Sequence, residues 1–154
     1  MPGRWAMLKT TELKVKDMLS QPYTVKPSLS VKDAIDLMRS KGLDFLSVTD
    51  ESNTLLGVLT ENDLIKIVKH ESPSIFAAST MWLDDVRKEY VNAPIRDIMH
   101  IKFASISPEE NILSAFKIMH ANNYKMLHVI DPKNRLLGII RIRDIFKELI
   151  DKSE

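Results

Sequence analysis

The sequence lacks cysteine, has few glycines and contains no long apolar run. Without cysteine among its 154 residues, the chain has no disulfide framework, thiolate metal site or cysteine nucleophile. A reducing cytoplasm is therefore the expected location. The four glycines (Gly3, Gly42, Gly57 and Gly138) stand too far apart for the loops that cradle phosphates. No stretch approaches the roughly 20 apolar residues of a membrane span, and no signal peptide precedes residue 15, so an unprocessed protein without membrane association is expected.

The charges are nearly balanced. Lysine and arginine total 22 against 21 aspartates and glutamates, which gives a formal net charge of +1. No excess of one sign draws the chain to a phosphate backbone, so no nucleic-acid partner is expected. The length is that of one compact domain and is too short for a large multidomain enzyme.

The chain contains an internal repeat. A shift of 80 places Val15-Lys16-Asp17-Met18 on Ile95-Arg96-Asp97-Ile98, and a shift of 81 aligns the longer stretch that follows. The one-residue insertion falls before Ser105, where a loop is expected. The positions matched at a shift of 81 are Pro27 on Pro108, Ala34 on Ala115, Met38 on Met119, Leu46 on Leu127, Val48 on Val129, Asp50 on Asp131, Asn53 on Asn134, Leu55-Leu56-Gly57 on Leu136-Leu137-Gly138, Asp63 on Asp144 and Lys66 on Lys147.

Each repeat is predicted to contain a strand, a helix, two strands and a second helix. The strands are expected at 23–25, 45–49 and 55–59, and at 103–106, 126–130 and 136–140. The closing helices are expected at 61–69 and 142–152, and the first helix begins after the N-cap Ser30. The apolar positions predicted to face the core are Val31, Ala34, Ile35, Leu37 and Met38 in the first repeat, and Ile112, Leu113, Ala115, Phe116, Ile118 and Met119 in the second.

This element order predicts an α/β (α+β) fold of two β-α-β-β-α repeats. A strand reached through a helical crossover lies parallel to its partner, whereas a short turn makes an antiparallel hairpin. Two helices leave one face of such a small sheet uncovered, so the repeats are expected to pack with pseudo-twofold symmetry, which makes two equivalent clefts.

Four segments follow from the repeat: an N-terminal segment (1–14), a first repeat (15–69), a linker (70–94) and a second repeat (95–154). The linker is longer than most connections. Leu83, Val86 and Tyr90 predict a short amphipathic helix between Met81 and Val91. Covering the core is the favoured interpretation, with a partner-binding or cleft-covering element as the alternative.

A glycine, a threonine and an aspartate mark the end of the first repeat. Gly57, Thr60 and Asp63 lie at a predicted strand end and the start of a helix, and Gly138 and Asp144 repeat the pattern with Arg141 in place of the threonine. A threonine three residues before an aspartate is typical of a helix cap. A carboxylate at a helix N-terminus also suits a vicinal diol such as that of ribose, and the adjacent N–H groups favour a phosphate. The arginine leaves two interpretations open, a phosphate contact and a solvent-exposed side chain.

The repeat, its apolar pattern and this glycine-threonine-aspartate ending resemble a tandem pair of CBS domains, the cystathionine-β-synthase type of module. The resemblance covers Val15 to Val68 and Ile95 to Leu149. One departure is that serine and histidine, Ser47 and His128, stand where the family often has proline in the middle strand.

The resemblance implies two nucleotide clefts and a set of ligand contacts. Aspartates contact the ribose, the threonine lies near ribose and phosphate, backbone at the first strand meets adenine, and apolar walls enclose the base. Lys41 and Asn122 stand where phosphate-facing residues occur in the family. Carried over to this sequence, the implied residues are Thr24, Lys41, Phe45, Thr60 and Asp63 in the first repeat, and Ser105, Asn122, Met126, Arg141 and Asp144 in the second.

The sequence therefore predicts a non-catalytic regulatory module that binds an adenine nucleotide (AMP, ADP or ATP) and changes the conformation of a partner protein. No nucleophile–base pair is recognisable, and the four histidines lack metal-ligand spacing. No cofactor is required, and the resemblance implies a homodimer. Two alternatives stay open. One is an assembly module with degenerate clefts, and the other is a chain that binds S-adenosylmethionine or another adenosyl ligand.

Overall fold

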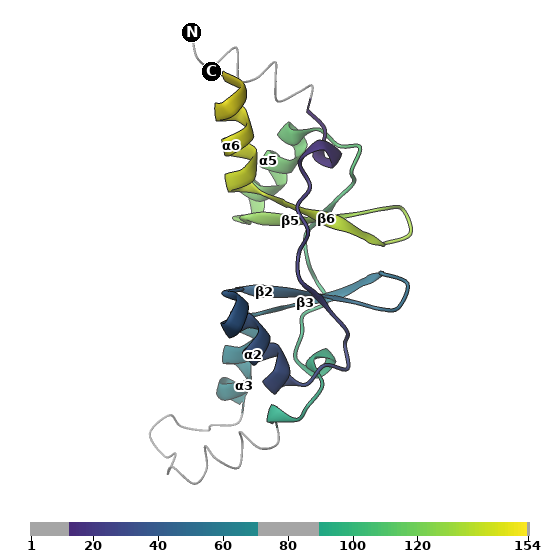
Figure 1. The fold of residues 1–154 in the computed structure, drawn as a ribbon, viewed down its shortest axis with the longest axis vertical. Coiled ribbons are helices and arrows are strands. Elements are labelled where there is room, and N and C mark those ends of the chain that lie inside the picture. Colours follow the sequence, from purple (N-terminus) through teal and green to yellow (C-terminus); the bar gives the residue numbers. More distant parts are fainter. Residues whose placement is uncertain (1–12, 71–89, 154) are drawn as a thin grey trace. The chain divides into compact units, whose positions relative to one another are not determined.

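The computed structural model describes residues 13–70 and 90–153 (Figure 1). Residues 71–89, which hold most of the predicted linker helix, lie outside the described residues. The element order predicted from the repeat is confirmed, and with it the α/β fold class. The first repeat contains β1 (Thr24–Val25), α2 (Val31–Lys41), β2 (Phe45–Thr49), β3 (Leu55–Thr60) and α3 (Glu61–His70). The second contains β4 (Ser105–Ile106), α5 (Ile112–Asn122), β5 (Met126–Ile130), β6 (Leu136–Arg141) and α6 (Ile142–Ser153).

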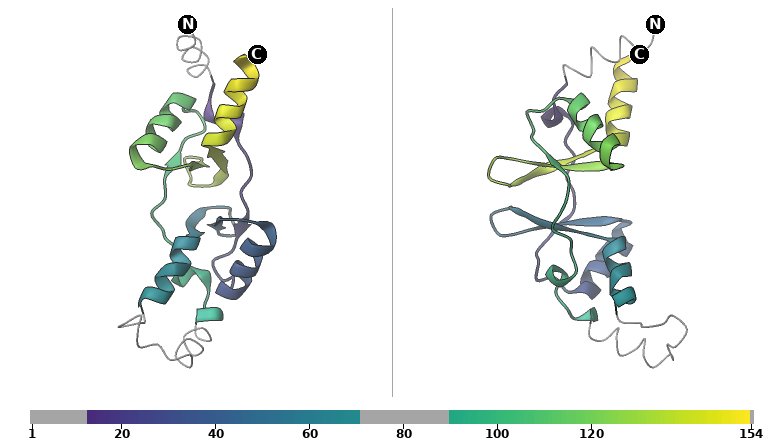
Figure 2. Two further views of the ribbon diagram at one scale, coloured as in Figure 1. Left: turned by 90° about the vertical axis from the view of Figure 1, so that its left-hand side faces the viewer. Right: turned by 180° about the vertical axis from the view of Figure 1, so that it is seen from behind.

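Each repeat forms its own three-stranded sheet, in the order β1-β2-β3 or β4-β5-β6. The first pair of strands is parallel and the second antiparallel, as the connections predict. The registers of the two sheets are equivalent: Phe45 lies opposite Thr60, and Met126 lies opposite Arg141. In Figures 1 and 2, α2 and α3 lie on one face of the first sheet, and α5 and α6 lie on one face of the second.

Local side-chain chemistry fixes the ends of these elements. The Ser30 hydroxyl accepts a hydrogen bond from the Asp33 N–H, which confirms the predicted N-cap, and α2 ends at Gly42 with a φ of 64°. In the hairpin between β2 and β3, Asp50 Oδ1 accepts from the N–H groups of Ser52 and Thr54, both at 2.9 Å. The second repeat forms the same turn around Asp131.

Each repeat has an apolar core between its sheet and its helices. Val31, Ala34 and Met38 of α2 are buried as predicted, whereas Ile35 is 40% exposed. The prediction for Ile35 was therefore wrong, because the covered stripe of α2 is narrower than its apolar pattern. In α5 the corresponding buried residues are Ile112, Ala115 and Met119.

The two repeats exchange the short turns that precede them. The 3₁₀ turn η1 (Val15–Met18) belongs to the first repeat in sequence, yet Val15 is fully buried in the core of the second. The turn η2 (Ile95–Asp97) reciprocates, because Ile95 is fully buried in the core of the first repeat. Equivalent backbone bonds hold both turns: Val15 N–H donates to Glu110 C=O, and Ile95 N–H donates to Leu29 C=O, each at 2.8 Å.

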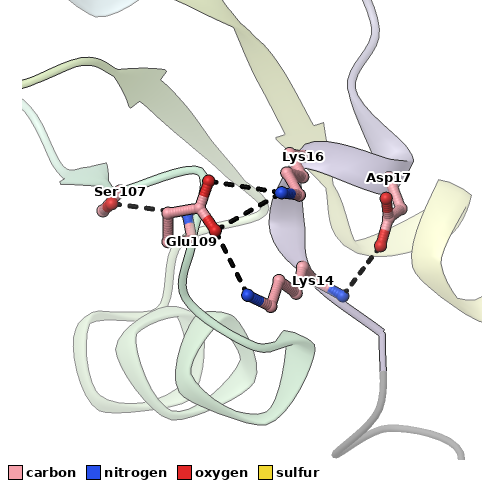
Figure 3. Close-up of polar contacts among 5 residues, drawn as sticks. All are labelled: Lys14, Lys16, Asp17, Ser107 and Glu109. Atoms are coloured by element: carbon pink, nitrogen blue, oxygen red, sulfur yellow. Dashed lines mark hydrogen bonds and ion pairs between the residues drawn. The ribbon is translucent and has the colours of Figure 1, made fainter.

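Two compact units result. The described part of one unit comprises 13–22 and 104–153, and that of the other comprises 23–70 and 90–103. In the former, Glu109 attaches η1 through ion pairs with Lys14 Nζ at 3.2 Å and Lys16 Nζ at 3.3 Å (Figure 3). The hydrogen bonds from these lysines, that from Lys14 first, lower the pKa of Glu109 below its usual 4.5.

Candidate functional site

Asp63 lies in the first turn of α3, directly after the edge strand β3. Its side chain is 1% exposed. The Thr60 N–H donates to Asp63 Oδ2 at 2.7 Å, and the Thr60 hydroxyl donates to the same oxygen at 3.0 Å. These bonds link the carboxylate to the residue before the helix, which is half of a capping box with the hydroxyl acting as donor. In this state Asp63 is therefore a helix-capping carboxylate.

A third group reaches the same carboxylate oxygen. His100 Nδ1 lies 2.8 Å from Asp63 Oδ2, and the imidazole is about one-third exposed while the carboxylate beneath it is covered. The segment that carries His100 runs antiparallel to β3, because His100 and Val58 exchange backbone hydrogen bonds at 3.0 and 3.1 Å. A Cβ on Gly57 would stand 2.8 Å from His100 C=O, so only glycine permits this approach.

The second repeat has the same backbone frame and different side chains. Ser20 and Ile139 exchange backbone hydrogen bonds at 2.9 and 3.0 Å, and a Cβ on Gly138 would stand 2.9 Å from Ser20 C=O. Ser20 therefore occupies the position that His100 holds in the first repeat. Its Oγ is buried and has no hydrogen-bond partner among the described residues.

Asp144, the counterpart of Asp63, is partly exposed at the first turn of α6. In the part of the chain that the structure describes, no hydrogen bond or ion pair joins its carboxylate to another group. It borders a pocket of about 360 Å³, here named the Asp144 pocket. Its lining residues are Asp17, Met18, Leu19, Ser20, Asp144, Lys147, Glu148 and Asp151. This pocket thus combines a partly exposed carboxylate, which can accept hydrogen bonds from a polar ligand, with Ser20, whose buried hydroxyl lacks a partner among the described residues.

The other predicted contacts of the second repeat are Ser105, Met126 and Arg141. Ser105, at the start of β4, lines a different pocket of about 440 Å³ together with Glu110, Ser114 and Lys117 of the following segment. Ser105 and Asp144 thus line different pockets. Met126 and Arg141 face each other in the β5–β6 register and are partly buried.

In the first repeat, Thr24 is exposed at the start of β1, and Phe45 is partly buried opposite Thr60. The two residues predicted to face phosphate, Lys41 and Asn122, are exposed at the last position of α2 and α5. Asn122 Nδ2 donates to Ile118 C=O within its own helix, at 2.9 Å. The side chains of Lys41 and Asn122 stay proposed ligand contacts.

Sequence reasoning missed His100 and Ser20. The signal that could have found them is the repeat itself, because the shift of 80 that matches Val15 with Ile95 also places Ser20 on His100.

His128, which stands where the resemblance to CBS domains leads one to expect proline, is 2% exposed in β5. Within residues 13–70 and 90–153, no three acidic, histidine or cysteine side chains are grouped to hold a metal ion. Nor does that part of the chain contain a helix long and apolar enough to cross a membrane.

The family model for the CBS domain matches residues 15–70 and 95–151. The chain belongs to the CBS-domain family. A relative of this CBS pair is an inosine-5'-monophosphate dehydrogenase of Methanocaldococcus jannaschii, 30% identical over 142 residues. Those residues are 92% of this chain and 24% of the enzyme, so the chain spans about a quarter of that relative's length.

Two solved CBS pairs share the fold. CBSX2, crystallised in complex with AMP, is 23% identical, with a TM-score of 0.73 over 92% of this chain and 99% of that one. A second CBS pair, crystallised with 5'-methylthioadenosine and S-adenosyl-L-methionine, is 22% identical, with a TM-score of 0.65 over 92% of this chain and 98% of that one. At these identities the similarity establishes the fold, and the ligands are those of the two other proteins.

Proposed function

We propose that this CBS pair is a non-catalytic regulatory module that binds an adenosine-containing ligand through Asp144 and, with lower affinity, through Asp63. Adenine nucleotides (AMP, ADP or ATP) are the first candidates. The observation that carries the proposal is Asp144 at the first turn of α6, partly exposed and bordering a pocket that Ser20 also lines. A carboxylate can accept both hydroxyls of a ribose, and a serine hydroxyl can donate to a second ligand group.

Signalling would follow from differential affinity. A ligand shifts a conformational equilibrium only by the difference in its binding free energy between the two states. The crystallised CBS pairs with AMP and with S-adenosyl-L-methionine support the ligand class, and the match within a dehydrogenase supports a regulatory role. A homodimer, a cytoplasmic location and a regulated protein partner belong to this proposal.

A specific observation favours a second candidate ligand. The Asp144 pocket is lined by four carboxylates (Asp17, Asp144, Glu148 and Asp151) and by one cation, Lys147. Such a negative lining opposes a polyphosphate and favours a ligand with positive charge. S-adenosylmethionine, which carries a sulfonium and an ammonium group, therefore competes with AMP as the occupant of this pocket.

Titration calorimetry of the ligand-free protein tests this function, with AMP, ATP and S-adenosylmethionine as probes. We expect Asp144→Asn to weaken the binding of the preferred probe by about tenfold to a hundredfold, since a hydrogen bond to a charged group contributes about 1.5–3 kcal/mol. The matched control is Glu110→Gln, which removes the same charge from the pocket that Ser105 lines. Equal affinity in the parent and in Asp144→Asn, or no binding of any probe, would reject the assignment.

A further inference from the structure

The two aspartates of the repeated motif are not equivalent in the folded chain. Asp63 is 1% exposed and lies within hydrogen-bond distance of the Thr60 N–H, the Thr60 hydroxyl and His100 Nδ1, whereas Asp144 is partly exposed beside a pocket. Thr60 supplies two of these contacts from within the motif. The third, His100, comes from a segment 37 residues further along the chain. The difference in exposure accompanies a difference in side chain at one repeated position, which holds His100 beside Asp63 and Ser20 in the Asp144 pocket lining.

The backbone holds these two residues in the same place. Each exchanges a pair of hydrogen bonds with the edge strand of its sheet, and each passes over a glycine that leaves no room for a Cβ. Because the two backbone arrangements match, the contact made with each aspartate depends on the side chain at this position. Imidazole is long enough to contact the aspartate at 2.8 Å, whereas the serine hydroxyl ends buried and without a partner.

We propose that His100 is a specificity-determining residue that occludes Asp63 until a ligand displaces it, and so makes Asp144 the higher-affinity site. This inference rests on the proposed function. A ribose diol needs carboxylate oxygens that it can reach, and in this state the Asp63 carboxylate lies beneath an imidazole that is itself about one-third exposed. Rotation of the His100 side chain uncovers Asp63 without moving the backbone bonds to Val58.

The free energy needed for that rotation lowers the apparent affinity of the Asp63 site. When only a fraction of the protein is competent to bind, the apparent Kd rises by the reciprocal of that fraction. At the Asp63 site, the competent fraction is the fraction of molecules in which the imidazole has left the buried carboxylate. Ser20 imposes no such requirement on Asp144, so the chain binds its two ligands in sequence.

Reciprocal substitutions test the proposal with AMP as the probe. In an Asp144→Asn background, which leaves the Asp63 site, we expect His100→Ser to tighten AMP binding by about tenfold, equivalent to about 1.4 kcal/mol. In an otherwise unchanged chain, we expect Ser20→His to weaken binding at the Asp144 site by a similar factor. Ser20→His removes no hydrogen bond of the Ser20 hydroxyl among the described residues, so it keeps the test informative even where His100→Ser lowers stability.

The outcomes separate this inference from the proposed function. Unchanged or weaker AMP binding at the Asp63 site of His100→Ser overturns the role of His100, because a histidine that helps to bind phosphate would give that result. The Asp144 site still binds AMP in that case, and the proposed function stands. Absence of AMP binding in the parent and in both variants overturns the role of His100, and the proposed function falls with it only where ATP and S-adenosylmethionine also fail to bind.

Discussion

At the scale of single residues, two carboxylates with lowered pKa values are held by different kinds of donor. The Thr54 N–H is the main cause that lowers the pKa of Asp50 below its usual 3.8, and it belongs to the local hairpin turn. Glu109 is held instead by Lys14 and Lys16, which lie more than 90 residues earlier in the chain. These lysines therefore stabilise the attachment of η1 to the second repeat.

The Glu109 interaction predicts a pH-dependent contribution to stability. Because the folded-state pKa of Glu109 is lowered, its stabilisation is present above the usual value of 4.5 and is lost as pH falls through the folded-state value. We expect Glu109→Gln to lower the Tm at pH 7 slightly, and the difference in Tm from the parent to shrink as the pH falls below 4.5. Thermal unfolding followed by circular dichroism between pH 3 and pH 7 measures this, with the 93% exposed Glu51 changed to Gln as control. A Tm difference independent of pH would contradict the prediction.

Residues whose partners are local were predictable, and those with distant partners were not. Ser30 and Asp50 bond to N–H groups within four residues, so sequence spacing indicates their roles. Thr60 and Asp63 also bond locally, which is why both the capping and the ligand interpretation could be stated in advance. The contact of His100 with Asp63 depends on how the segment after η2 pairs with β3, and no motif of neighbouring residues encodes that pairing.

At the scale of elements, apolar periodicity predicted the strands and helices to within a few residues at their ends. The predicted strand at 126–130 coincides with β5, and the predicted helix at 61–69 is one residue shorter than α3. The exchange of η1 and η2 was not predicted, because a turn of three or four residues has no periodicity that names its partner. Packing decides it, through the burial of Val15 and Ile95.

The exchanged turn η2 predicts a large effect of one apolar substitution. Ile95 is fully buried, so Ile95→Ala should lower the free energy of unfolding by about 2–5 kcal/mol through lost burial and a residual cavity. Ile101 lies six residues further on and is 71% exposed, and Ile101→Ala should change it by less than about 0.5 kcal/mol. Urea unfolding of both variants compares the same chemical change at the two sites, and equal effects would argue against the packing of η2 in the first repeat.

At the scale of the whole molecule, repeats in sequence and units in space differ. The family model matches residues 15–70 as one CBS domain, yet the core of the first repeat includes Ile95 and is packed against Ala93, Ile98 and Met99. The boundaries of the compact unit that contains this core lie instead before Tyr23 and after Phe103. A fragment of residues 23–103 keeps the η2 segment, and a fragment of residues 15–70 loses it.

The two fragments should therefore differ in stability. Domains are stable by only about 5–15 kcal/mol, so losing the burial of Ile95 and the hydrogen bonds to Leu29, Pro27 and Val58 removes a large share. We expect residues 23–103 to unfold cooperatively in urea, and residues 15–70 to show no cooperative transition. Adding a synthetic peptide of residues 90–103 to the shorter fragment should restore the transition, because that peptide carries the missing contacts. A cooperative transition of residues 15–70 without the peptide would show that the sequence repeat, and not the contact unit, is the folding unit.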